Sequence, residues 1–487
     1  MSIAEVVSAA RAAQPAWAET PLARRADAVR AVAVAIVEKR AEVAAIIGEE
    51  TGRWGTEALL NEVIALIPSV EGHIRNAKRV LVSETIVPGR MDWPGKRIVV
   101  DPLPRGVVGI VAPWNYPLMN FFKSLWPALL AGNAVVMKPS ELTPRTAVWL
   151  AEQCAKALPA GLVGVVVGAG DAGEAVIDAV DAVVFTGSMR TGRRVAARCG
   201  ERLIPCSVEL GGKDAAIVLA DCDLDRTVAG VAKWALTNAG QDCSSIERIL
   251  VESAIADRFV EKLDRFVRKL TAGTDGPADF GAIQSEAQLA IIEAHVADAI
   301  AKGARCLSGG QRGEGRLYPA TLLDGVTPEM TVFREETFGP ILAVTRVADA
   351  EQAIRLANDC AYGLGGSVWT RDVTRGAALA RRLDVGMAWV NNHSISSSFP
   401  EAPWTGVKGS GFGVAQSPWA YPVFVRPRTL MVDTNTAPDP FWMPADATLA
   451  PFVEAVANRS LGSLGAIFQL LGLLGKRVAA IRAAAAG

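Results

Sequence analysis

The sequence predicts an α/β protein with two parallel-sheet domains of the Rossmann type. From residue 106 onward, short apolar β-rich runs alternate with helical stretches, which is typical of a parallel sheet covered by helices on both faces. The same alternation starts again after Gly212, and this predicts a second domain of the same class. The chain has 487 residues, half of them apolar, so it is long enough for about three domains with large cores.

Residues 4–50 and 56–76 are expected to be helical. Apolar residues recur there at helical spacing. One stripe consists of Val6, Val7, Ala10, Ala13 and Trp17, and the next starts with Ala26, Val29, Ala33, Ile36 and Val37. These helices precede the first expected strand of the sheet.

Residues 80–101 have a different pattern and predict a hairpin. Val80-Leu81-Val82 and Ile98-Val99-Val100 are short β-rich runs, and the turn pairs Pro88-Gly89 and Pro94-Gly95 separate them. Residues 423–432 form a later β-rich run that could pair with this hairpin.

The strands of both expected sheets are apolar runs bounded by turns. In the first domain they are 107–112, 134–137, 164–167 and 182–185; in the second they are 215–219 and 249–251, with helices at 223–239, 254–271 and 285–302.

Composition excludes several classes of function. The net charge is −1 and no basic block stands out, so a nucleic-acid partner is not expected. The seven cysteines follow no spacing pattern and the three histidines lie far apart, so neither a disulfide framework nor a metal site is expected. The N-terminus lacks the basic and apolar regions of a secretory signal, which predicts a reducing, cytoplasmic setting.

Two motifs carry the chemistry: Glu209-Leu210-Gly211-Gly212-Lys213 and Gly240-Gln241-Asp242-Cys243. A cysteine attacks as its thiolate, which requires a site that lowers its pKa. An acyl-cysteine is then cleared by water, and the water needs a base. Taken singly, a cysteine is usually an inert buried thiol and paired glycines usually mark a turn. In this order, Cys243 and Glu209 could supply both halves of such a cycle.

Together the two motifs resemble the aldehyde dehydrogenase superfamily, and further matches run from about Ala9 to Asp433. The resemblance implies an NAD(P)-dependent, non-acylating enzyme in which Cys243 is the nucleophile and Glu209 the base. It also assigns Asn115, in Pro113-Trp114-Asn115, to the oxyanion together with the Cys243 N–H. In isolation, Asn115 would be interpreted as a turn residue.

The Gly168–Gly173 segment matches GxGxxG, but no acid follows at the distance that a ribose contact requires. It is therefore interpreted as a tight turn, near the adenine at most. The resemblance instead gives Lys138 and Glu141 to the adenine-side ribose, and Glu141 would repel a 2′-phosphate, which favours NAD, with NADP possible. The residues that the resemblance places at the cofactor are Trp114, Lys138, Ser140, Glu141, Gly187, Ser188, Gly192, Leu210, Glu336 and Phe338.

The resemblance also divides the chain. It implies a cofactor domain at 1–79 and 102–210, a catalytic domain at 211–414 and an oligomerisation arm at 80–101 and 415–433. The chain lacks an extended segment that often precedes the first helices, as in the shorter, dimeric branch, so a homodimer is expected.

Apolar aldehydes, medium to long aliphatic or aromatic, are the expected substrates. No lysine or arginine cluster stands near the expected mouth segments, and Asp242 would disfavour a second carboxylate on the substrate. The mouth residues are Trp114, Tyr116, Met119, Phe122, Trp126, Phe399, Pro403 and Trp404. Succinic semialdehyde is the alternative; a coenzyme A-acylating enzyme is disfavoured by Glu209, and a non-catalytic relative by the presence of all three catalytic residues.

Residues 434–487 form a C-terminal extension with a proline-rich linker and two helices, at 449–459 and 461–482. The second carries an apolar stripe: Leu464, Ile467, Phe468, Leu471, Leu474, Val478 and Ile481. Its apolar run from Leu464 to Gly475, broken only by Gln469, is shorter than the roughly 20 residues of a bilayer span, so a transmembrane helix is not expected. The extension resembles that of fatty aldehyde dehydrogenases, which implies a lid over the substrate funnel; peripheral membrane contact and dimer packing remain alternatives.

Overall fold

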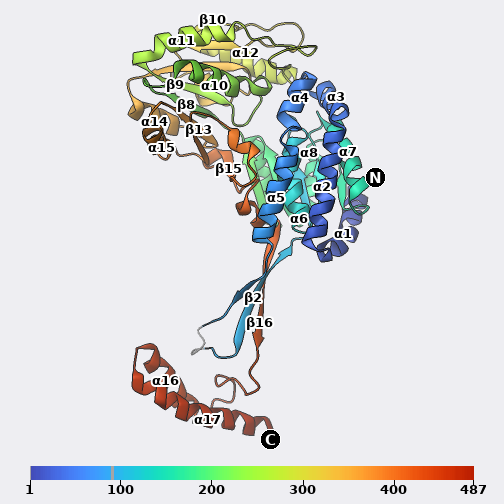
Figure 1. Ribbon diagram of the computed structural model, residues 1–487, viewed down its shortest axis with the longest axis vertical. Helices are drawn as coiled ribbons and strands as arrows, with labels where there is room; N and C mark the ends of the chain where they lie inside the picture. The colour runs from blue at the N-terminus through green and yellow to red at the C-terminus, as the bar shows by residue number, and fades with distance from the viewer. Residues whose placement is uncertain (1, 89–92, 487) are drawn as a thin grey trace. The chain divides into compact units, whose positions relative to one another are not determined.

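The computed structural model describes residues 2–88 and 93–486 and confirms the α/β class (Figure 1). Clustering of contacts divides the chain into two units. The first comprises Met1–Leu81 with Leu103–Arg426, and the second comprises Val82–Pro102 with Pro427–Gly487.

The first unit begins with five helices, as the sequence predicts. They are α1 (Ile3–Glu19), α2 (Leu22–Glu38), α3 (Arg40–Thr51), α4 (Gly55–Glu62) and α5 (Leu66–Val80). The stripes of α1 and α2 are buried, and Val29, Val32, Ala33 and Ile36 are fully enclosed. Amphipathic helices of this kind are stabilised mainly by packing of the apolar face.

A six-stranded sheet has the order β15-β7-β6-β3-β4-β5. Its strands are β3 (Val107–Val111), β4 (Ala134–Lys138), β5 (Val163–Val165), β6 (Ala182–Gly187), β7 (Cys206–Leu210) and β15 (Gly411–Phe412); its helices are α6 (Met119–Leu130), α7 (Pro144–Ala157), α8 (Gly170–Ala179) and α9 (Met189–Glu201). All pairings are parallel except β15 with β7. The chain winds outward from β3 in one direction and returns through β6 in the other, so β3 and β6 flank the switch point where such sheets bind ligands.

A seven-stranded sheet has the order β10-β11-β12-β9-β8-β13-β14. Its strands are β8 (Asp214–Val218), β9 (Ile246–Glu252), β10 (Arg305–Ser308), β11 (Thr321–Asp324), β12 (Ile341–Val347), β13 (Gly365–Trp369) and β14 (Met387–Val390). Helices of this part are α10 (Leu224–Leu236), α11 (Ser253–Val267), α12 (Glu286–Ala301), α13 (Thr331–Arg334), α14 (Ala350–Asn358) and α15 (Val373–Ala380). Short 3-10 turns are η1 (Thr237–Gly240), η2 (Ile395–Ser398), η3 (Lys408–Ser410) and η4 (Pro418–Val423).

Central strands of both sheets are buried along their whole length, as β4 and β8 illustrate. Strands covered on both faces need apolar residues at successive positions rather than at alternate ones. This explains why continuous apolar runs located these strands in the sequence.

The second unit contains the expected arm as a three-stranded sheet, β1-β2-β16. Its strands are β1 (Glu84–Ile86), β2 (Lys96–Pro104) and β16 (Val425–Asp433). The prediction of a strand at Val80-Leu81-Val82 was wrong: Val80 ends α5, and β1 starts later. A β-branched run can complete the last turn of a helix when the helix packs on a core, and tertiary context overrides propensity there. The turn residues Gly89–Asp92 lie outside the described residues.

The C-terminal extension folds into α16 (Leu449–Ser460) and α17 (Leu464–Ala486), which pack against each other (Figure 1). Arg477 fastens α17 to the linker. Its side chain is buried, donates to the carbonyl of Pro440 at 2.9 Å and to that of Trp442, and pairs with Asp446 at 3.1 Å. A cavity of about 570 Å³ lies between the linker, α16 and α17, and the linker's Phe441 contacts Phe452 on its wall.

One side of α17 is exposed. Leu464, Phe468 and Leu471 keep 76%, 78% and 67% of their surface exposed. The helix has 23 residues and, within the described chain, is the one element long and apolar enough to cross a membrane by length and composition. The helix was expected at 461–482 and is found at Leu464–Ala486; by length and composition it passes the test for a span that its shorter apolar run was expected to fail.

Candidate functional site

Cys243 lies on a strained turn between η1 and β9. Asn238, Ala239 and Gly240 are successive left-handed residues with φ of 54°, 55° and 70°. A Cβ atom on Gly240 would stand 2.1 Å from the carbonyl oxygen of Gly339, so only glycine fits there. Strain of this kind persists only where the surroundings hold it, and it is frequent at active sites.

Asn115 follows β3, at the switch point of the first sheet, and is buried against this turn. Its Nδ2 donates to the carbonyl of Gln241 at 3.1 Å, and its own carbonyl accepts from Asn238 Nδ2 at 2.9 Å. Its Oδ1 accepts from Asn120 Nδ2, which fixes the orientation of the amide. One Nδ2 hydrogen thus binds the turn. Because these hydrogen bonds fix the plane of the amide, they also fix the direction of the second Nδ2 hydrogen.

Glu209 stands near the carboxyl end of β7 and is 5% exposed. Burial raises the pKa of its carboxyl to about 8, and Lys123 opposes that effect. Its Oε1 atom has no hydrogen-bond partner among the described residues. A buried, unpaired carboxyl with a pKa near neutrality is suited to act as a base.

The pKa of the Cys243 thiol is raised in this site, whereas a lowered pKa was expected. Burial, with the nearby charge of Asp242, raises its pKa well above the ordinary value, and Lys123 opposes the change. Attack as the thiolate therefore requires that the thiol proton leave first. Glu209 is one of the groups whose charge raises the pKa of this thiol.

Asp242 is bound within the loop rather than presented to a substrate. Its Oδ2 accepts from the Tyr116 hydroxyl at 2.7 Å, and its Oδ1 accepts from the backbone N–H and the hydroxyl of Ser244, both at 2.9 Å. The expectation that Asp242 repels a second carboxylate is weakened, because this charge is already well solvated by the protein.

Lys123, on α6, is a single cation beside the expected mouth residue Trp404, where the sequence showed no lysine or arginine cluster. Its Nζ lies 3.9 Å from the centre of the Trp404 ring, and it acts electrostatically on both Glu209 and Cys243. Sequence inspection missed it because a single lysine in an apolar helix forms no cluster.

Two expected mouth residues lie elsewhere. Phe122 and Trp126 stack on each other at 5.1 Å within the main core and are 3% and 0% exposed. Residues one helical turn apart share a face, and here that face is directed toward the core.

A small apolar cluster packs around Cys243. Its buried members are Leu364, Met387, Trp389, Trp404 and Ala415, and Ile395 joins them at the edge. Cys243 therefore lies at the edge of an aromatic and aliphatic cluster.

On the adenine side, Lys138 ends β4 and is 5% exposed. Burial lowers its pKa, and Glu141, at 3.8 Å and largely exposed, opposes this. Ser140 accepts from the Leu142 N–H. Asp171, at the start of α8, also acts on Lys138, so the Gly168–Gly173 turn lies beside the residue expected to hold the ribose.

Ser188 caps α9 at the end of β6, accepting from the Thr191 N–H at 3.3 Å. The start of this helix is suited to an anion. Gly192 and Leu210 contact each other instead: a Cβ atom on Gly192 would stand 2.3 Å from Leu210 Cδ2. A Cβ atom on Gly187 would stand 2.6 Å from Cζ of the Phe185 ring. The two glycines thus allow close packing of helix, turn and sheet.

On the nicotinamide side, Glu336 accepts from the Gly212 N–H at 3.1 Å, and burial raises its pKa to about 8. A buried carboxyl with so few donors can accept two ribose hydroxyls, so the residue fits the expected cofactor. Phe338 meets Trp114 edge-on at 5.5 Å, and its φ of 53° shows a constrained turn.

Glu247 holds that turn and was not anticipated. It accepts from the backbone N–H groups of Thr337 and Phe338, at 2.7 and 2.9 Å, and forms a buried ion pair with Lys213. The signal in the sequence was the lysine that ends the Glu209–Lys213 motif.

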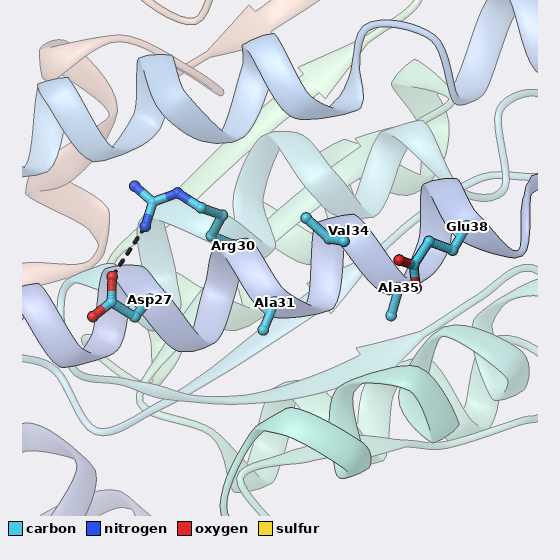
Figure 2. A pocket seen from close by; sticks show the side chains of 6 residues that line it. All are labelled: Asp27, Arg30, Ala31, Val34, Ala35 and Glu38. Atoms are coloured by element: carbon cyan, nitrogen blue, oxygen red, sulfur yellow. Dashed lines mark hydrogen bonds and ion pairs between the residues drawn. The ribbon is translucent and has the colours of Figure 1, made fainter.

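A hollow of about 430 Å³ along the outer face of α2 is a different kind of feature (Figure 2). One helix supplies its whole lining: Asp27, Arg30, Ala31, Val34, Ala35 and Glu38. Arg30 pairs with Asp27 there at 3.0 Å. The lining contains no nucleophile, so the chemistry is assigned to the Cys243 site.

Comparisons with known proteins agree with this geometry. Residues 1–430 match the model of the aldehyde dehydrogenase family. A protein of Mycolicibacterium smegmatis, named as an NADP(+) succinate-semialdehyde dehydrogenase, is 39% identical over 422 residues, covering 84% of this chain and 80% of its own. The 4,4'-diapolycopene aldehyde oxidase of a Methylomonas species is 36% identical over 449 residues, covering 92% and 84%. The crystal structure of a Mycobacterium tuberculosis aldehyde dehydrogenase complexed with NAD+ superposes with a TM-score of 0.84 at 34% identity, covering 89% of this chain and 92% of that one.

The raised pKa of the Cys243 thiol predicts slow alkylation at neutral pH. Labelling of Cys243 by iodoacetamide, followed by peptide mass spectrometry, should still be rising with pH at 9. Asp242→Asn should move the labelling profile to lower pH, because the Asp242 charge raises the pKa of the thiol. Lys123→Met should move it to higher pH, because the Lys123 charge lowers that pKa. Half-maximal labelling of the wild type below pH 8 would show that the site lowers the pKa after all.

Proposed function

The chain belongs to the aldehyde dehydrogenase family and is an NAD(P)-dependent oxidoreductase of aldehydes; on this premise we propose that it oxidises apolar aldehydes to carboxylic acids at Cys243. The observation that carries the substrate class is the apolar cluster around the nucleophile. The catalytic roles rest on the hydrogen bond of Asn115 to the Gln241 carbonyl beside Cys243 and on the buried, unpaired carboxyl of Glu209.

The proposed reaction starts when the Cys243 thiol releases its proton to solvent and the thiolate Sγ bonds to the aldehyde carbon. Asn115 Nδ2 and the Cys243 N–H donate to the oxyanion. Bound nicotinamide dinucleotide supplies the hydride acceptor. Loss of hydride from the thiohemiacetal carbon leaves a thioester on Cys243. Glu209 then deprotonates a water, which displaces the thiolate and releases the acid.

Cys243→Ala should abolish turnover, because it removes the nucleophile. Glu209→Gln should permit one burst of NADH and then retain a thioester, since the water lacks its base. Asn115→Ala should lower kcat roughly a hundred-fold. Stopped-flow absorbance measures the NADH burst, and intact-protein mass spectrometry measures the retained thioester. Steady turnover by Cys243→Ala, or a full steady-state rate in Glu209→Gln, would overturn these roles.

For the cofactor, we propose NAD in preference to NADP. Lys138, Glu141 and Ser140 would hold the adenine-side ribose, Ser188 the phosphates, and Glu336 the second ribose, with Phe338 and Trp114 beside the nicotinamide. Glu141 lies 3.8 Å from Lys138, and a carboxylate there disfavours a 2′-phosphate. The exposure of Glu141 is the reason that NADP stays an alternative, as the name of the M. smegmatis relative also suggests.

Succinic semialdehyde is a second candidate, and Lys123 is the observation that favours it. A cation held on the Trp404 ring beside Cys243 and Glu209 could pair with the carboxylate of a short semialdehyde. The name of the M. smegmatis relative points the same way. Against it, the rest of the wall is apolar, and a cation on an aromatic face is already stabilised.

A substrate panel separates the two candidates. Octanal and benzaldehyde should have higher kcat/KM than succinic semialdehyde, and Lys123→Met should leave the octanal KM within about threefold. Lys269→Met, an exposed lysine, is the matched control. A preference for succinic semialdehyde, lost in Lys123→Met and retained in Lys269→Met, would select the second candidate.

For assembly, we propose a cytoplasmic homodimer in which the β1-β2-β16 arm pairs with its copy. Both outer strands of the arm expose their side chains, and exposed strand edges favour pairing with another chain. All seven cysteines are free thiols, which suits a reducing compartment.

For the extension, we propose peripheral contact of α17 with an anionic lipid surface. The exposed Leu464, Phe468 and Leu471 can enter the headgroup region, and residues after Glu454 carry only basic charges. Arg477, buried against the linker, would have to leave its partners for the helix to span a bilayer, which favours a helix lying in the surface.

Full-length protein should float with phosphatidylglycerol vesicles, and a protein lacking residues 445–487 should not. Phe468→Asp with Leu471→Asp should abolish flotation too, because the change charges the exposed stripe, while Val453→Asp on α16 is the control. Absence of flotation, together with an altered aldehyde chain-length preference in the truncated protein, would select the lid interpretation.

A further inference from the structure

His393 lies directly behind the nucleophile, on the loop that follows β14. The imidazole is completely buried. Its Nε2 atom is 3.0 Å from the carbonyl oxygen of Ser244, the residue after Cys243, and 3.3 Å from Asp214 Oδ2. Its Nδ1 atom is 2.9 Å from Ser367 Oγ.

The hydrogen-bond partners of the ring indicate which nitrogen carries a hydrogen. The Ser244 carbonyl can only accept a hydrogen bond, so Nε2 carries a hydrogen. Ser367 Oγ accepts from Trp369 Nε1 at 3.0 Å and therefore has its own hydrogen to give to Nδ1. A hydrogen on Nε2 that is donated to the Ser244 carbonyl, with the Ser367 contact at Nδ1, satisfies both contacts and fixes the ring between β13 and the nucleophile loop.

The same loop holds Ser244 a second time. Ser244 Oγ donates to Asp242 at 2.9 Å, so the 2.7 Å contact between Ser394 Oγ and Ser244 Oγ is a donation from Ser394. Ser394 is left-handed, with φ of 52°, which directs successive residues of the loop toward Ser244. Main chain and side chain of Ser244 are thus both held from residues 393–394.

The backbone of the nucleophile loop packs closely against Gly212, next to Asp214. Asp214 Oδ1 accepts from the Gly365 N–H at 3.0 Å. A Cβ atom on Gly212 would stand 2.3 Å from the Cys243 carbonyl oxygen and 2.7 Å from Asp214 Oδ1. Gly212 therefore lies between these two groups, and Asp214 with His393 forms the rear support of Cys243.

We propose that His393 is a positioning residue for the reaction, which acts by fixing the Ser244 carbonyl and with it the Sγ and N–H of Cys243. The proposal rests on Cys243 being the nucleophile. Displacement of a reacting group by about 1 Å can lower a rate a hundred-fold, whereas substrate binding at the outer wall would be little changed. The effect is therefore expected in kcat rather than in KM.

The chain offers matched comparisons at one position and a control elsewhere. A glutamine amide can reach the Ser244 carbonyl from position 393, and an asparagine amide is too short. His393→Gln should keep kcat within about threefold of the wild type, and His393→Asn should lower it roughly 10- to 100-fold, with KM within about threefold in both. His73, equally buried on α5 and without a partner for its Nε2, is the control: His73→Asn can lower thermal stability without lowering kcat.

A second readout follows the thiol itself. His393→Asn should also change the iodoacetamide labelling rate of Cys243 at fixed pH, and His73→Asn should not. If His393→Asn does not fold, as circular dichroism would reveal, Ser394→Ala replaces it, with an expected severalfold loss of kcat at unchanged KM. Equal kcat in His393→Asn and His393→Gln, or an unaffected kcat in Ser394→Ala, overturns the proposal. Turnover by Cys243→Ala would instead overturn the role of the nucleophile.

Discussion

The buried ion pair of Lys213 with Glu247 connects the segments from which the site is made. Lys213 ends the motif that starts with Glu209, and Glu247 follows Cys243 by four residues on β9. Glu247 also accepts from the N–H groups of Thr337 and Phe338, next to the carboxyl expected to hold the cofactor. Leaving either charge of the pair uncompensated would cost about 3–5 kcal/mol, so the pair holds the segments that carry Glu209, Cys243 and Phe338 in one arrangement.

Around that pair, the acidic groups of the site have few positive charges or hydrogen-bond donors to stabilise their ionised forms. Burial raises the pKa of Glu209 and of Glu336 to about 8, and raises that of the Cys243 thiol as well. Each group is therefore harder to ionise in this site than in water. Lys123 lowers the pKa of both Glu209 and Cys243 and so opposes the effect of burial. The same side chain places a positive charge on the Trp404 ring, in the apolar cluster beside Cys243.

The C-terminal extension shows how a stable local fold can still need a partner. Arg477 is buried against the linker and α16 packs on α17, yet Leu464, Phe468 and Leu471 remain exposed. Burying three such side chains would gain roughly 1.5–3 kcal/mol each. The exposed stripe is therefore a surface with a favourable energy of association, whether the partner is a lipid surface or protein.

The sequence by itself determined the fold class, the central strands and the catalytic candidates, because these depend on local patterns. Continuous apolar runs mark strands that are buried on both faces, as at Val107–Val111, and glycine-containing motifs mark close approaches of the backbone. Only the tertiary structure decided that Val80 ends a helix, that Phe122 and Trp126 belong to the core, and that Lys123 faces the site. It also decided the direction of the Cys243 pKa and the place of His393 behind Ser244. These properties depend on desolvation and on contacts between residues more than a hundred positions apart, and no local pattern encodes them.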